Sequence, residues 1–157
     1  MSIKFLKKLQ LIKIDVLVFR MTKETMLPFP DLGWMIQNKI ISKGKKKYFI
    51  VDKGSSIHQS VLYDKVHLLK LVKKRGGAIG DCVTHPDHRG KSIYPFVIHH
   101  IANEILVKNT NQEVFMIVNR DNQDSINGIE KAGFKKYASI QTKRWLCFYF
   151  DTNLIIE

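Results

Sequence analysis

Residues 84–95 read THPDHRGKSIYP and join two segments whose hydrophobic patterns differ. The preceding residues 78–84, AIGDCVT, have the composition of a β-strand. The following residues 92–107 carry an apolar side chain at every fourth position, which predicts an amphipathic helix. The repeated positions are Ile93, Val97, Ile101 and Ile105. Pro95 falls in the first helical turn, where its missing N–H group does no harm. The stretch therefore predicts a polar turn between a strand and a helix.

The predicted turn ends in four residues typical of an anion-binding site, Arg89, Gly90, Lys91 and Ser92. Backbone N–H groups at the start of a helix have no partner in the helix, and the helix dipole is positive there. Gly90 allows close approach of the backbone to a ligand, while Arg89 and Lys91 add positive charge. The alternative is an ordinary strand-to-helix turn with no ligand.

A second strand and helix follow in the same order. Residues 113–119, EVFMIVN, have the pattern of a buried strand. Residues 123–132 are predicted to form a helix, and Gly133 is a typical helix stop.

Most of the remaining chain has the pattern of strands. The predicted strands cover residues 11–20, 48–52, 57–63, 136–141 and 144–151. Asp31 is predicted to cap a short helix that runs to about Ile41. Together these elements predict one domain of the α/β (mixed α+β) class, with a central mixed, twisted sheet and helices on both faces.

Charge is the unusual property of the composition. The 157 residues include 26 Lys and Arg against 14 Asp and Glu, a formal net charge of +12. This excess predicts an anionic partner, either nucleic acid, an acidic membrane surface or a phosphate-bearing small molecule. The alternative is that surface lysines only keep the protein soluble. The run KGKKK, residues 43–47, is predicted to be a solvated turn.

Neither secretion nor membrane insertion is expected. The two cysteines, Cys82 and Cys147, are far apart and form no disulfide or zinc pattern. Residues 1–19 lack a signal-peptide cleavage site and are predicted to be a structural element. No apolar run is long enough to span a bilayer, so we expect a soluble, cytoplasmic protein.

Four histidines raise the question of a metal site: His85, His88, His99 and His100. His99 and His100 are adjacent on a predicted helix and cannot face one ion together. No set of Cys and His residues has the spacing of structural zinc, so no metal is expected.

Two runs in the second half of the chain resemble motifs of the GNAT superfamily of acyl-CoA-dependent N-acetyltransferases. The family's P-x-x-R-G-x-G-x-G run is similar to residues 86–94, PDHRGKSIY. A later family run, N-x-x-(A/S)-x-x-x-Y-x-K-x-G-F, is matched at Asn122, Ser125, Lys131, Gly133 and Phe134. The resemblance covers residues 77–137, and the residues before 77 contain no motif of the family.

The resemblance implies acetyl-CoA as cosubstrate. The backbone from Arg89 to Tyr94 would hold its pyrophosphate, while the strand edge at 82–84 and Asn122 would hold the pantetheine arm. The implied coenzyme-binding residues are Cys82, Val83, Thr84, Arg89, Gly90, Lys91, Ser92, Ile93, Tyr94, Asn122, Ser125 and Lys131.

Three positions depart from the family pattern. Two of its glycines are Ser92 and Tyr94 here. Tyr94 is expected to point away from the phosphates or to pack near the adenine end. The family's frequent general-acid tyrosine falls at Ile129, which cannot donate a proton. Either another residue donates it, or the thiolate leaves unaided, or the protein binds acyl-CoA without catalysis.

Candidate catalytic residues follow from the implied reaction, in which an amine attacks the thioester. Asp81 is the first candidate for the general base, with His58 as base or water relay and Tyr137 as general acid. Strand alternation places Asp81 and Val83 on one face. Backbone N–H groups near Val83 would polarise the carbonyl. The alternatives are structural, and Cys82 fits a small core residue better than an acetyl-cysteine intermediate.

The expected function is transfer of an acetyl group to a primary amine of a small molecule. A polycationic acceptor would need an acidic cleft, so an amino sugar on an anionic carrier fits the charge better. The alternatives are protein or peptide N-acetylation, acyl-CoA binding without catalysis, and a basic nucleic-acid-binding module, which no motif supports.

The domain is expected to have three parts and to be a monomer or a homodimer. Residues 1–76 would form the acceptor side, 77–137 the acyl-CoA-binding part and 136–151 a terminal strand pair.

Overall fold

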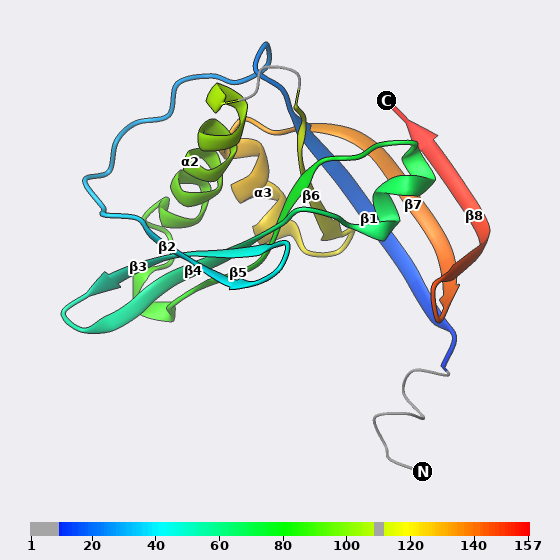
Figure 1. Ribbon diagram of the computed structural model, residues 1–157, viewed down its shortest axis with the longest axis horizontal. Helices are drawn as coiled ribbons and strands as arrows, with labels where there is room; N and C mark the ends of the chain where they lie inside the picture. Colours follow the sequence, from blue (N-terminus) through cyan, green and yellow to red (C-terminus); the bar gives the residue numbers. More distant parts are fainter. Residues whose placement is uncertain (1–9, 109–111) are drawn as a thin grey trace.

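The computed structural model describes residues 10–108 and 112–157, and these contain one mixed sheet of eight strands with helices packed on it (Figure 1). The strands are β1 (Ile12–Met21), β2 (Gln37–Ser42), β3 (Lys45–Asp52), β4 (Ser55–Tyr63), β5 (Gly77–Thr84), β6 (Val114–Asn119), β7 (Lys135–Trp145) and β8 (Phe148–Ile156). The helices are α2 (Ile93–Lys108), α3 (Gln123–Lys131) and the 3-10 helices η1 (His67–Val72) and η2 (Pro86–His88). The mixed α+β class is therefore confirmed. Residues 1–9, the start of the predicted N-terminal element, lie outside the described residues.

The first strand of the chain lies inside the sheet. The strand order is β2-β3-β4-β5-β6-β1-β7-β8, so β1 pairs with β6 on one side and β7 on the other, antiparallel to both. This position explains the apolar run in β1, where Val18, Phe19 and Met21 have no exposed surface. Of the strand pairs that the structure describes, only β5 and β6 are parallel.

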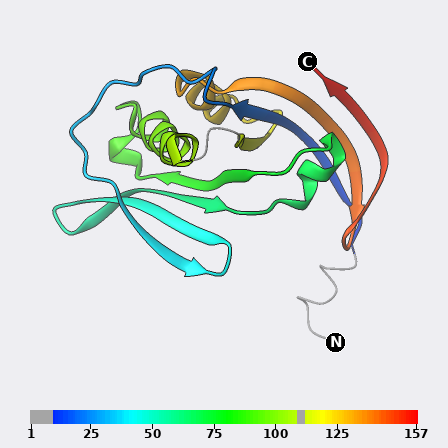
Figure 2. The same ribbon diagram turned by 45° about the horizontal axis from the view of Figure 1, so that its top comes forward.

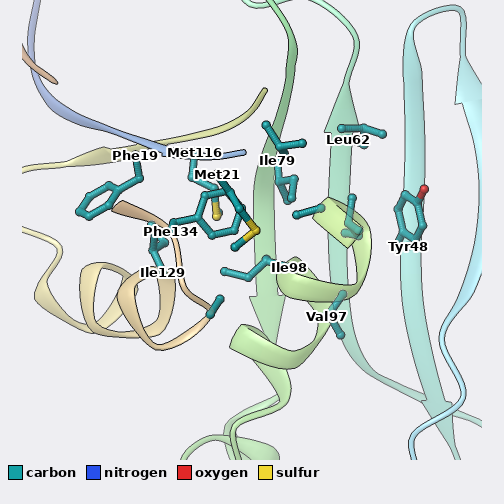
Figure 3. Close-up of a cluster of buried hydrophobic side chains, with 14 of the residues drawn as sticks. Phe19, Met21, Tyr48, Leu62, Ile79, Val97, Ile98, Met116, Ile129 and Phe134 are labelled. Carbon is teal, nitrogen blue, oxygen red and sulfur yellow. The ribbon is translucent and has the colours of Figure 1, made fainter. Parts of the chain in front are cut away.

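The two α-helices cover one face of this sheet, and η1 covers part of the other (Figure 2). Figure 3 shows the core on the α-helical side, where Ile98 of α2 and Ile129 of α3 pack with Phe19 of β1. On the other face, Leu69 of η1 packs with residues of β1 and β6. The helices expected on both faces are found, although they are unequal in size.

The helix predicted from Asp31 to Ile41 is wrong. Residues 26–36 have no regular secondary structure, and β2 begins at Gln37. Asp31 accepts a hydrogen bond from the Gly33 N–H at 2.8 Å, and Gly33 has φ +71°, so the aspartate closes a turn and caps no helix. The segment runs along α2, where Phe29 and Phe96 have ring centroids 6.3 Å apart (Figure 1).

The parallel strands β5 and β6 pair only at their first residues. The pairing covers Gly77 to Ile79 and ends at the pair Ile79 and Met116. Beyond that point β5 continues to Thr84 and β6 to Asn119 without pairing to each other. Within residues 10–108 and 112–157, the facing edge of β5 therefore has no strand partner from Gly80 onward.

Candidate functional site

A β-bulge shapes β5 where it leaves β6. Gln59 pairs with Val83 and Val61 pairs with Gly80, so Asp81 and Cys82 both lie opposite Ser60. Asp81 takes a left-handed conformation, with φ +48°, which is strained for a residue other than glycine. The bulge turns Cys82 and Thr84 toward α2 and leaves Asp81 on the other face, as strand alternation predicted.

A cavity of about 670 Å³ lies between the end of β5 and the two helices. Its lining is Cys82, Val83, Thr84, His88, Arg89, Gly90, Ser92, Ile93, Tyr94, Pro95, Asp124, Ser125, Asn127, Gly128 and Lys131. The structure brings ten of the twelve residues expected to bind the coenzyme to this one cavity.

The first turn of α2 presents free N–H groups to this cavity. The Phe96 N–H donates to the Ser92 carbonyl at 3.1 Å, and among the described residues the N–H groups before Phe96 have no helical partner. Gly90 and Ser92 have φ +76° and +59°, which folds the turn tightly. Lys131 of α3 donates to the Ser92 hydroxyl at 2.7 Å, which adds positive charge beside the helix start.

Two of the expected coenzyme residues lie elsewhere. Lys91 is exposed and does not line the cavity. The Asn122 side chain accepts from the Ser125 N–H at 3.2 Å, so Asn122 caps α3.

Tyr94 fills the contact between the two α-helices. Its ring lies so close to Gly128 that a Cβ there would come within 2.4 Å of Tyr94 Cδ1. Burial, and secondly the neighbouring Cys82, raises the pKa of the Tyr94 phenol, so it remains protonated. We did not identify Gly128 from the sequence, although a glycine inside a predicted helix is a signal of close packing.

A chain of hydrogen bonds lies behind the cavity wall. Ser60 donates to Cys82 Sγ at 3.1 Å, and the two ring nitrogens of His58 lie 2.8 Å from Ser60 Oγ and Thr84 Oγ1. Since the Ser60 proton points to sulfur, its oxygen accepts from His58 Nε2–H, and His58 Nδ1 accepts from Thr84. Burial lowers the pKa of His58 to about 4 and raises that of Cys82 to about 12, so both are neutral at pH 7.

The three candidate catalytic residues are not brought together. Asp81 is exposed and accepts a hydrogen bond from the Tyr63 hydroxyl. His58 is 1% exposed and lies on the helical face of the sheet, opposite to Asp81. There its ring contacts Thr84, which lines the cavity. Tyr137 is on β7, where its ring lies 4.6 Å from the Arg20 guanidinium carbon, and β6 and β1 separate it from β5.

The histidines do not converge on a metal. In the described part of the chain, no group of three or more His, Cys, Asp and Glu residues is placed to hold an ion. His99 Nε2 lies 2.7 Å from the Leu27 carbonyl, and His88 lines the cavity. The buried His88 Nδ1 has no hydrogen-bond partner among the described residues. No described helix has the length and apolar character needed to cross a membrane.

Comparisons with known proteins find a matching family model and similar solved structures. Residues 62–146 match the family model described as FR47-like protein. Among solved structures, an acetyltransferase from the GNAT family from Colwellia psychrerythraea is similar over 81% of this chain, with a TM-score of 0.56 and 9% identity. The aligned part is 54% of that protein, so the chain spans about half its length, and the likeness shows the fold alone. No curated protein matches the chain.

Proposed function

The chain belongs to the FR47-like family within the GNAT superfamily, and from this membership we propose that it transfers an acetyl group from acetyl-CoA to a primary amine. One observation carries the proposal: the free edge of β5 and the first turn of α2 open into the same cavity. An extended amide chain can pair with the strand edge while its phosphates meet the helix start.

The residues around the cavity fit coenzyme A. The volume of the cavity, about 670 Å³, is within the range of roughly 300–1,000 Å³ typical of ligand pockets. The N–H groups before Phe96, together with Arg89 and Lys131, offer donors and positive charge to a pyrophosphate. His88 Nδ1, which lacks a partner among the described residues, is a further polar atom that a bound coenzyme could satisfy.

The chemistry is a direct attack of the amine on the thioester carbonyl. The C–N bond forms, the C–S bond breaks and the electron pair leaves on sulfur. An ammonium must first lose a proton, and Asp81, beside the end of the β5–β6 pairing, is our candidate to receive it. The second proton of the amine reaches the departing thiolate. A thiol pKa near about 8.5 makes that thiolate a tolerable leaving group.

Thermal unfolding with and without acetyl-CoA tests the proposal. At about 100 times its dissociation constant, a ligand that binds only the folded state adds about 2.7 kcal/mol of stability. We expect a clear rise in melting temperature and acetylation of at least one small amine. Unchanged melting at millimolar acetyl-CoA would contradict the cofactor assignment.

A second candidate function is acyl-CoA binding without catalysis. It is favoured by Ile129, which is 1% exposed and packs in the core on α3. This candidate predicts the same thermal shift with no turnover on any amine, so the two measurements separate it from the enzyme.

A further inference from the structure

One half of the sheet has a face that none of the described helices covers. On β3, Lys46 and Tyr48 point toward α2, where both reach Glu104 at 2.9 and 3.2 Å. Alternation therefore turns Lys45, Lys47 and Phe49 to the opposite face. Packing contacts place η1 on the same side, against Ala78 and Phe115, near the start of β5 (Figure 2).

This open face has lysines and aromatic rings arranged next to each other. We define it as Lys39, Lys45, Lys47, Phe49, Tyr63 and Asp81. Register pairs Lys39 with Lys47 and Lys45 with Tyr63, so each pair projects from one side of the sheet. The Lys39 ammonium lies 5.9 Å from the Phe49 ring centroid, and the Lys45 ammonium lies 5.2 Å from that of Tyr63.

A carboxylate marks the inner end of the open face. Tyr63 donates its hydroxyl hydrogen to one oxygen of Asp81, and its ring lies over Gly80, 3.6 Å from where a Cβ would be. Among the described residues, no hydrogen bond reaches the other carboxylate oxygen. Asp81 is therefore held in place with one oxygen free, at the point where β5 separates from β6.

We propose that the open face binds the acetyl acceptor, and that this acceptor is a nucleotide-linked primary amine. The inference rests on the proposed acetyl transfer. The lysines bind the phosphates, the base lies against the Phe49 ring, and the ammonium is held by Asp81. Lysine is a common phosphate ligand, and aromatic faces stack on nucleobases.

The opposite faces of β5 give the two substrates separate approaches. Cys82 and Thr84 line the coenzyme cavity on the helical side, while Asp81 faces the acceptor. The ammonium gives one proton to Asp81, which passes it to solvent. The neutral amine then attacks the carbonyl carbon of the thioester, and it loses a second proton to the sulfur that departs. A free polyamine carries no anion to offset repulsion by three lysines, so it is a poor fit.

The test compares UDP-glucosamine with glucosamine, which carries the same amine without the nucleotide. We expect UDP-glucosamine to raise the melting temperature of the wild-type protein more than glucosamine and to be acetylated with a higher kcat/KM. The Lys45→Gln, Lys47→Gln double variant should bind UDP-glucosamine at least about tenfold more weakly. Lys46→Gln is the matched control, because Lys46 is on the same strand and points to the other face.

Different results distinguish failure of this inference from failure of the proposed function. Binding is measured without acetyl-CoA, so it decides the acceptor face even if no transfer occurs. Equal melting shifts with the two sugars, equal loss in Lys46→Gln, or tighter binding of a short single-stranded oligonucleotide would overturn the inference. Missing acetyl-CoA binding, with UDP-glucosamine binding intact, would overturn only the proposed function.

Discussion

The ring of Tyr94 lies against the backbone of Gly128, and both residues line the cavity between β5 and the two α-helices. A Cβ at Gly128 would be 2.4 and 2.6 Å from two ring carbons of Tyr94. Contacts under 3.0 Å require something to move, so a Cβ at Gly128 would displace either the Tyr94 ring or α3. The tyrosine ring at position 94 therefore requires a glycine at position 128 in this packing.

Gly128→Ala should lower the free energy of unfolding by about 1–3 kcal/mol, because its Cβ overpacks the contact with the Tyr94 ring. The gain in helix propensity, about 1 kcal/mol, offsets only part of this loss. Urea unfolding measures the change. Adding Tyr94→Ala, which removes the ring, should make the Gly128→Ala step neutral or stabilising. A double variant in which Gly128→Ala costs as much as in the wild type would show that the contact is not the cause.

The part of the fold around the cavity could be predicted because its signals are local. A four-residue repeat indicated α2, a buried-strand pattern indicated β6, and the polar residues between β5 and α2 indicated a turn. Each of these features depends on residues within one segment. The prediction of a helix at 31–41 was wrong for the opposite reason. An aspartate such as Asp31 can close a turn to Gly33 as readily as it can cap a helix, and the segment is held by a contact with α2, which is distant in the sequence.

Long-range pairing could not be predicted in the same way. The sequence indicated a strand at 11–20 but not its place between β6 and β7, which begin about a hundred residues later. Likewise the pairing of Asp81 with Tyr63 depends on a bulge that shifts the register of β4 and β5. Strand pattern fixes which residues share a face, whereas partners depend on the whole sheet.

Ser92→Asp should weaken acetyl-CoA binding strongly, since a carboxylate would face the pyrophosphate at the start of α2. Lys91→Asp changes the charge more, yet Lys91 does not line the cavity, so its effect should be smaller. The acetyl-CoA-dependent rise in melting temperature measures both variants. If Lys91→Asp removed the rise and Ser92→Asp kept it, the pyrophosphate would not lie where we propose that it binds.

Stability should fall as the pH decreases from about 6.5 to about 4, because of His58. Burial lowers its pKa to about 4 in the folded protein, whereas the unfolded chain has a value near 6.5. The unfolded state therefore binds more protons in this window, and the free energy of unfolding should drop by up to about 3 kcal/mol. Urea unfolding at several pH values checks this.

A His58→Gln variant should have a flatter pH dependence over the same window, although its overall stability is lower. His100→Gln is the control, because His100 is exposed on α2. Equal slopes in wild type and His58→Gln would show that His58 is not the group that titrates.

The two cysteines should react with a thiol reagent at very different rates. Cys147 is exposed in the turn between β7 and β8, whereas burial raises the pKa of Cys82 to about 12. Because the thiolate is the reactive form, Cys82 in a Cys147→Ser variant should label at least about a hundredfold more slowly than Cys147 in a Cys82→Ser variant at pH 8. In denaturant the difference should disappear. Since Cys82 lines the cavity in which we propose that the coenzyme binds, acetyl-CoA should slow its labelling further and leave Cys147 unaffected. Equal slowing of both would mean that the coenzyme acts on global stability and does not cover Cys82.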